Sequence, residues 1–198
     1  MNHEEAPDLR ARNKQATREA IGAAALRLAV EQGSPLVRVY DIATEAGVSP
    51  RTYNNYFSSR EEAICAFQAD RARRIGQALL ARPAGEPLGE AILAAVVEHS
   101  SPEPDRAGLR MIMSTPALEG EALKAFTMAE GPLAAAVAER IGADPETDMF
   151  SHVLAAAIAG AVRVAGRHWI NGDGSESFAT VAERAVRHIL PATAPYDR

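Results

Sequence analysis

The stretch that decides the fold is DIATEAGVSPRTYNNYF, from Asp41 to Phe57. Its spacing predicts two short helices, at about residues 40–46 and 50–56, joined by a tight turn in which Gly47 supplies a positive φ. Ser49 followed by Pro50 is typical of an N-cap before the first helical residue. We therefore predict a helix-turn-helix with these core positions: Ile42, Ala43, Ala46, Gly47, Val48, Tyr53 and Phe57.

The second of these helices has a polar outer face made of Arg51, Asn54 and Asn55. Arginine matches the O6 and N7 acceptors of guanine, and asparagine matches N6 and N7 of adenine, each with two hydrogen bonds. These three side chains are therefore candidates for reading base edges in double-stranded DNA. The alternative is a solvated helix pair in a protein of another class, such as a helical enzyme that carries the same motif.

The stretch from Val39 to Ile64, VYDIATEAGVSPRTYNNYFSSREEAI, resembles the DNA-binding signature of the tetracycline-repressor (TetR) family. That resemblance implies a three-helix DNA-binding head, a long linking helix, a helical ligand domain and a dimer. It also implies phosphate contacts from Ser49, Thr52, Tyr56 and Arg60, and we add the basic residues Arg12 and Lys14 to this set.

Three positions depart from the family pattern. Arg38 stands where a threonine commonly caps the second helix, so we expect a weaker cap there. Asn54 replaces a common tyrosine, which indicates an altered base preference, and Arg60 replaces a lysine, which suits a phosphate contact. The segment from Thr52 to Ile64 also resembles an actinobacterial subgroup in which some members sense acyl-coenzyme A-like ligands.

Charge and composition place the chain among globular proteins. Of 198 residues, 47% are apolar and 24% charged, and the net charge is -5. Residues 9–60 nevertheless carry a net charge of +4, as expected of a basic DNA-reading segment on an acidic body. The single cysteine, Cys65, excludes a disulfide within the chain. The polar, acidic start is no secretory signal, and the longest apolar run, residues 153–162, is too short to span a bilayer, so we expect a cytoplasmic protein without membrane contact.

Helical periodicity and end signals continue along the whole chain, which predicts an all-α fold of about nine helices. Outside the motif they lie at about residues 12–32, 59–82, 86–100, 106–114, 116–141, 145–170 and 175–190. Ser59 and Glu62 form a capping box that opens the fourth helix. We divide the chain into a DNA-binding domain at 9–60 and a ligand-binding and dimerisation domain at 61–190, with disordered tails at 1–8 and 191–198.

The last two long helices are the expected dimer interface. One is rich in small residues and the other carries an apolar stripe, and two-fold symmetry suits a reader whose single helix contacts few bases. The expected interface residues are Ala157, Gly160, Ala161, Phe178, Val181, Ala185, Val186 and Ile189. The alternative is that the same residues form a core within one chain.

The helices after residue 86 offer more apolar surface than a supporting domain needs, so we expect a cavity for a small hydrophobic effector, with an acyl-CoA-like molecule as one candidate. Adaptable and aromatic side chains suit its wall, and nearby arginines suit an anionic head group. The expected residues are Met111, Met113, Phe126, Met128, Arg110, Arg167 and Trp169. The alternatives are a fully packed core and ordinary surface cations.

No metal-ligand spacing, nucleotide-binding loop or hydrolase elbow occurs, so we expect no metal, no cofactor and no enzyme activity. The sequence therefore favours a homodimeric, DNA-binding transcriptional repressor released from a palindromic operator by its effector. A ligand-independent regulator or an activator is the alternative within this class.

Overall fold

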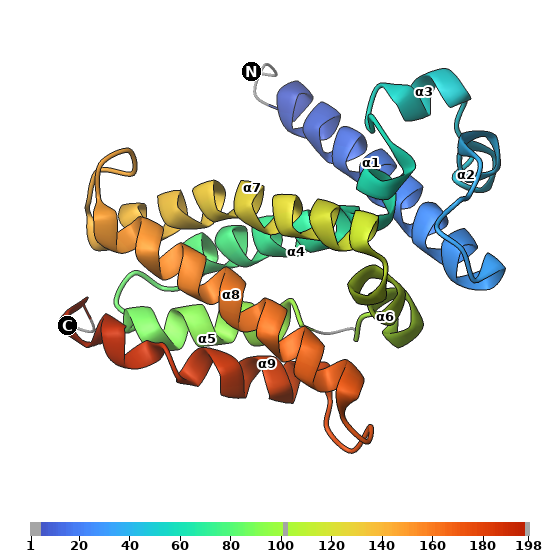
Figure 1. Cartoon of the computed structure of the whole chain (residues 1–198). Helices are drawn as coiled ribbons and strands as arrows, with labels where there is room; N and C mark the ends of the chain where they lie inside the picture. Colours follow the sequence, from blue (N-terminus) through green and yellow to red (C-terminus); the bar gives the residue numbers. More distant parts are fainter. Residues whose placement is uncertain (1–4, 101–102, 197–198) are drawn as a thin grey trace.

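A computed structural model of the protein describes residues 5–100 and 103–196. Within that part of the chain every regular element is helical, which confirms the all-α fold (Figure 1). The elements in order are α1 (Glu5–Gln32), α2 (Val39–Glu45), α3 (Pro50–Asn54), α4 (Arg60–Ala81), α5 (Leu88–Glu98), α6 (Arg106–Ser114), α7 (Pro116–Ile141), α8 (Met149–Asn171), α9 (Phe178–Arg187) and a 3-10 helix η1 (Leu190–Tyr196).

Helices α1, α2 and α3 and the first turns of α4, residues 60–66, form a small unit at one end of the molecule, which we call the head (Figure 1). Its core contains Ile21 of α1, Ile42 of α2 and Tyr53 of α3, all 1% exposed or less. Helix α1 contributes small alanine side chains to this core, which allows α4 to approach it closely.

The rest of the chain from α4 onward is the body. Helices α4 and α7 lie side by side, and α8 packs across α7 (Figure 1). Helix α9 packs against α8 and α5, and α5 also contacts α4. By length and composition α8 resembles a membrane-spanning helix, as many core helices do. Here ten of its residues, Trp169 and Ile158 among them, are buried against neighbouring helices, which identifies it as a core helix.

The head and the body are not separated at residue 60. The core of the head includes Ile112 from α6 and Leu118 and Ala122 from the start of α7. The core of the body begins on α4 at Ile75. The two cores therefore meet within α4, and α6 contributes to both.

Two helix starts differ from the sequence-based expectation. We expected the long helix α8 to begin at Pro145, but it begins at Met149, where the carboxylate of Asp148 accepts a hydrogen bond of 2.8 Å from the backbone N–H of Ser151. The Asp144 carboxylate instead accepts from the N–H of Glu146 at 2.9 Å, which makes a local turn. Helix α9 begins after Ser177, three residues later than the expected Ser175.

The disordered tails were wrong where the structure describes them. Helix α1 already begins at Glu5, while residues 1–4 lie outside the described part. At the other end, residues 190–196 form η1, in which Thr193 is fully buried and its hydroxyl donates to the carbonyl of Leu190 at 2.7 Å. The remaining residues, 197–198, are not described.

The apolar stripe of α9 faces the inside of its own chain. Phe178, Val181 and Val186 are 1%, 5% and 0% exposed, packed against α5 and α8. Side chains with so little accessible surface have little left to bury against a second copy, so within one chain they form part of its own core. Ala185 and Ile189 also pack on this core but are only half-buried, so part of their surface is left for a partner.

Candidate nucleic-acid interface and effector cavity

The turn between α2 and α3 has the geometry that the sequence predicts. Gly47 adopts a φ of 67°, and the N–H of Val48 donates to the carbonyl of Ala43 at 2.9 Å. Ser49 then caps α3, since its hydroxyl accepts from the N–H of Thr52 at 3.0 Å. A side chain at residue 47 would be strained in this left-handed conformation, so the glycine fixes the direction in which α3 leaves α2.

Aromatic side chains fix α3 to the rest of the head. Tyr53 is 1% exposed and its hydroxyl donates to the carbonyl of Ser59 at 2.9 Å. Burial, with the charges of Glu62 and Glu61 adding to it, raises the pKa of Tyr53 to about 12. Phe57 lies beneath the guanidinium of Arg18 at 4.4 Å from its ring centre. These contacts hold the recognition helix rigidly from below, as precise base contacts require.

The opposite face of α3 is open. Arg51, Asn54 and Asn55 are all exposed, and within the described residues their side chains make no hydrogen bond or ion pair. Side chains with this freedom can satisfy their donors and acceptors on another molecule without first breaking internal bonds. The three predicted base-reading residues are therefore together on one exposed surface.

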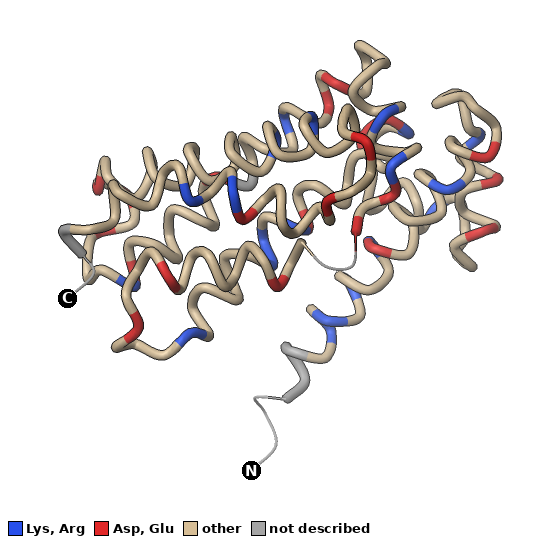
Figure 2. Tube along the Cα trace, turned by 90° about the horizontal axis from the view of Figure 1, so that it is seen from below, with Lys and Arg blue, Asp and Glu red and all other residues tan. Residues whose placement is uncertain are grey.

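Four of the six expected phosphate contacts lie on α3 or within a few residues of its ends, and the other two lie on α1. Ser49 and Thr52 share a hydrogen bond of 2.9 Å at the N-terminus of α3, and Tyr56 is half-buried just after it. Arg60 begins α4 and lies 3.4 Å from the carboxylate of Glu61. Arg12 and Lys14 are exposed on the first half of α1, which projects away from the body (Figure 2).

One departure from the family pattern has a visible structural effect. Arg38 occupies the N-cap of α2 and its side chain makes no capping hydrogen bond, as its replacement of a threonine predicts. Asp41 lies in the first turn of α2, where its negative charge interacts favourably with the helix dipole.

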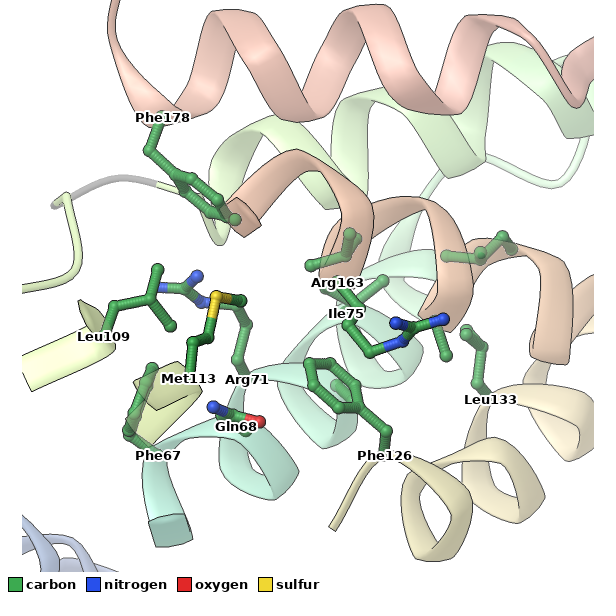
Figure 3. A pocket seen from close by; sticks show the side chains of 15 residues that line it. Phe67, Gln68, Arg71, Ile75, Leu109, Met113, Phe126, Leu133, Arg163 and Phe178 are labelled. Atoms are coloured by element: carbon green, nitrogen blue, oxygen red, sulfur yellow. The ribbon is translucent and has the colours of Figure 1, made fainter. Parts of the chain in front are cut away.

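A cavity lies in the body, between α4, α6, α7 and α8, with the start of α9 at one side (Figure 3). Its empty space is about 550 Å³ when the part open to solvent is included, but a water-sized sphere can enter only about 40 Å³ of it, so a small molecule fits only if side chains of the wall move. Most of the wall is apolar, and its larger side chains are Phe67, Ile75, Leu109, Met113, Phe126, Leu133 and Phe178. Its polar groups come from Gln68, Arg71 and Arg163.

Comparisons with known proteins agree with this arrangement. The sequence family described as bacterial regulatory proteins, tetR family, matches residues 21–63, and the family described as MftR C-terminal domain matches residues 82–194. The chain is also 32% identical to the HTH-type transcriptional regulator TcmR of Streptomyces glaucescens, over 93% of this chain and 88% of that protein. The chain belongs to the TetR family. It is a TetR-family transcriptional regulator, with a helix-turn-helix DNA-binding domain followed by a ligand-binding domain.

Solved structures of TetR-family proteins share the fold. A putative regulator from Mesorhizobium loti has a TM-score of 0.56 at 16% identity, covering 93% of this chain and 98% of its own. The repressor FadR of Thermus thermophilus, solved in complex with lauroyl-CoA, has a TM-score of 0.53 at 19% identity, covering 88% and 94%. These likenesses confirm the family architecture.

Only some of the residues that we predicted for the pocket line the cavity of the body. Met113 and Phe126 line the cavity, but Met111 packs against the core of the head and Met128 is 78% exposed. Trp169 is 4% exposed in the core of the body, where its ring N–H donates to the carbonyl of Glu176 at 3.2 Å. Met111, Met128 and Trp169 were therefore wrong as wall residues, because composition does not tell which face of a helix borders a space.

The two predicted cations of the pocket are engaged elsewhere. Arg110 donates to the carbonyl of Ile170 at 3.3 Å and does not line the cavity. Arg167 lies 3.7 Å from Glu119 and borders a smaller hollow next to the cavity. The cations on the cavity wall are Arg163 and Arg71 instead.

Sequence reasoning missed the contribution of α4, which we treated as a linker. Phe67, Arg71 and Ile75 are spaced by four residues and line the cavity along one face, with Gln68 beside them (Figure 3). A mixed stripe of this kind, with a glutamine and an arginine on an otherwise apolar face, was the available signal. Within the described residues, no three His, Cys, Asp or Glu side chains are grouped as a metal site requires.

Proposed function

We propose that this TetR-family regulator is a homodimeric repressor that binds a palindromic DNA operator and releases it when a small hydrophobic molecule occupies the body cavity. The observation that carries the proposal is the exposed, internally unpaired set Arg51, Asn54 and Asn55 on a helix fixed from below. Such a helix fits the major groove, and its operator would lie in the cytoplasm of the cell.

Helix α8 supports the dimer. Its outer face carries exposed apolar side chains, with Met149 at 77%, Val153 at 61% and Val164 at 45% exposure. Half-buried Ala157 and Gly160 continue the same line, and a Cβ on Gly160 would contact nothing within 4 Å in its own chain. A stripe of this kind along a whole helix is what a second copy would cover, bringing two α3 helices about 34–36 Å apart.

Helix α6 supports a coupling between cavity and head. Leu109 and Met113 line the cavity, whereas Ile112, on the same helix, is 1% exposed in the core of the head. Gly108 lies against α1 so closely that a Cβ there would stand 2.8 Å from Cδ1 of Leu26. A molecule large enough to push α6 outward from the cavity would therefore press it against α1.

The effect of the ligand on DNA follows from this contact. A bound ligand favours the position of the head in which the cavity is wide enough to hold it. In that position the head binds the operator less well. The coupling is expected to be about 1–3 kcal/mol and reciprocal, so operator DNA weakens ligand binding by the same factor.

The test is a selection of bound fragments from random DNA with the full-length protein. We expect a palindrome with half-sites one helical turn apart. Arg51→Ala and Asn55→Ala should each weaken binding to the selected operator by about 1–3 kcal/mol and relax the preference at one base pair per half-site. The control Arg187→Ala, on α9 at the other end of the body, should bind normally.

Two results would contradict the proposal. One is the absence of any enriched sequence. The other is an equal loss on operator and random DNA for both head variants, because that would limit these side chains to phosphate contacts.

A further inference from the structure

The wall of the cavity contains a half-buried cation without an anion. Arg71 extends from α4 into the body, and within the described residues its guanidinium makes no hydrogen bond and no ion pair. Its Nε is fully buried and unsatisfied. Its near neighbours are aromatic, with the ring centre of Phe178 at 4.8 Å and that of Phe67 at 5.9 Å. Aromatic faces stabilise a cation but leave its hydrogen-bond donors unused.

The energetics of this arrangement are unfavourable without a further partner. Burial, together with the nearby charge of Arg74, lowers the pKa of Arg71 to about 10, so the group is still charged at neutral pH. Partial burial of an unpaired charge is unfavourable, and a bound anion would satisfy the Nε donor that the protein itself leaves without a partner.

A second unsatisfied group lies one turn away on the same face. Gln68 is 5% exposed, and its Oε1 is the other buried side-chain atom of the described residues that lacks a hydrogen-bond partner. Figure 3 shows its amide between Phe67 and Phe126, on the floor of the cavity. The wall of the cavity therefore carries a guanidinium and an amide from residues one helical turn apart, among apolar side chains.

We infer that Arg71 and Gln68 form an anion-binding subsite, so that the effector is a hydrophobic organic acid bound through its free acid group. The acid would accept hydrogen bonds from Arg71, and the amide of Gln68 would bond a polar group next to it. This inference rests on the proposed function, in which the cavity holds the effector.

The same residues argue against a coenzyme A thioester as the group held at this subsite. A thioester is uncharged and supplies no anion to Arg71. The neighbouring hollow, into which Arg71 also faces, is lined by the acids Glu19, Asp70, Glu103 and Asp105. Its other arginine, Arg74, is paired with Glu19 at 2.9 Å. The phosphates of coenzyme A would meet mainly negative charge there.

Two fluorescent probes of nearly the same shape test the subsite directly. Anilinonaphthalene sulfonate carries an anion and N-phenylnaphthylamine does not, and both brighten in apolar cavities. We expect wild-type protein to bind the sulfonate at least about tenfold more tightly than the neutral probe. Dodecanoate should displace the sulfonate, whereas dodecanol and dodecanoyl-coenzyme A should each need about ten times more. Equal affinity of the two probes, or displacement by the thioester at lower concentration than the free acid, would overturn the inference.

Substitutions assign the effect to Arg71. Arg71→Met should remove the difference between the two probes while leaving the neutral one unaffected, and Arg71→Lys should retain part of it. The control Arg110→Met removes a nearby arginine that does not line the cavity, and it should leave the difference unchanged. The melting temperature of Arg71→Met should equal or exceed that of wild type, because an unpaired and partly buried charge is removed. A difference that survives Arg71→Met, or a melting temperature lowered by this substitution as by loss of a structural ion pair, would contradict the assignment.

None of these measurements involves DNA, so they can fail separately from the proposed function. Release of the operator by neutral hydrophobic compounds as readily as by acids would retain the repressor and reject the anion subsite. Selective binding of acids without any effect on operator affinity would retain the subsite and reject the repressor mechanism.

Discussion

Arg140, near the end of α7, holds the connection between α4 and α5. Its side chain is 8% exposed, and its guanidinium donates to the backbone carbonyls of Arg82 at 3.1 Å, Pro83 at 2.7 Å and Glu86 at 2.8 Å, with a longer contact of 3.5 Å to Leu79. The carbonyls of Arg82, Pro83 and Glu86 follow the end of α4, and that of Pro83 also accepts from the backbone N–H of Glu86 at 3.1 Å. The arginine therefore supplies hydrogen-bond donors where the helix no longer does.

Arg140→Met keeps the apolar stem and removes all of these donors. A hydrogen bond from a charged group contributes about 1.5–3 kcal/mol, but water can reach part of the loop, and the ordered arginine loses side-chain entropy in the native state. We therefore expect a loss of about 2–4 kcal/mol in the free energy of unfolding rather than the sum of three such bonds. For a chain of this length the melting temperature should fall by roughly 4–16 °C.

Differential scanning calorimetry at a fixed protein concentration measures this shift, since concentration alone moves the melting temperature of a dimer. The matched control is Arg187→Met, which removes an exposed ion pair with Glu183 of 2.7 Å and should lower the melting temperature by about 2 °C or less. The reasoning is refuted if the two variants melt alike, or if Arg140→Met melts within about 2 °C of wild type.

The remaining predictions concern the DNA contact, the dimer, acid stability and thiol reactivity. Arg60→Ala should weaken binding to all DNA sequences alike and lower the salt slope of log K by about one unit for each phosphate that the arginine neutralises, and an unchanged slope would show that Arg60 makes no phosphate contact. Val153→Glu should yield monomers in light scattering while Leu36→Glu, at an exposed apolar site on the head, leaves the oligomeric state alone; dimers from both would place the interface elsewhere. The hydrogen bonds from Arg82 lower the pKa of Glu86. The stability that this carboxylate contributes is therefore present above its unfolded pKa of about 4.3 and is lost as the pH falls through the folded value. Glu86→Gln should make the melting temperature fall less steeply at acid pH, and an unchanged pH dependence would count against this reasoning. Burial raises the pKa of the Cys65 thiol to about 12, so a thiol-specific disulfide reagent at neutral pH should react with the denatured chain and leave the native protein unmodified.

Local signals predicted the head well because its structure is determined by neighbours in sequence. The cap at Ser49, the left-handed Gly47 and the inward Tyr53 all depend on residues within one or two turns. The same holds for the cap at Ser59, although the Glu62 carboxylate bonds to the backbone N–H of Ser58, one residue earlier than a capping box predicts.

The body was less predictable because residues far apart in the sequence determine which face of each helix is covered. The stripe containing Val181 and Val186 on α9 was recognised, but periodicity shows that a face is buried without showing which surface covers it. The cavity residues Gln68 and Arg71 could not be found by composition, since a polar residue on a helix is ordinarily solvated. Their importance follows from the helices α6 and α8 that close over them.

The shared packing of α4, α6 and α7 limits how such regulators can be recombined. A hybrid joined at residue 60, with this head on another body, would leave Ile21 and Ile42 facing side chains that belong to a different core, because Ile64, Ile112 and Leu118 would be removed with the old body. Exchange of operator specificity is therefore expected to succeed when only the exposed surface of α3 is transplanted. In evolutionary terms, the DNA sequence that is read can diverge quickly at a few surface positions, whereas the joint between reader and sensor has to change as a coordinated set.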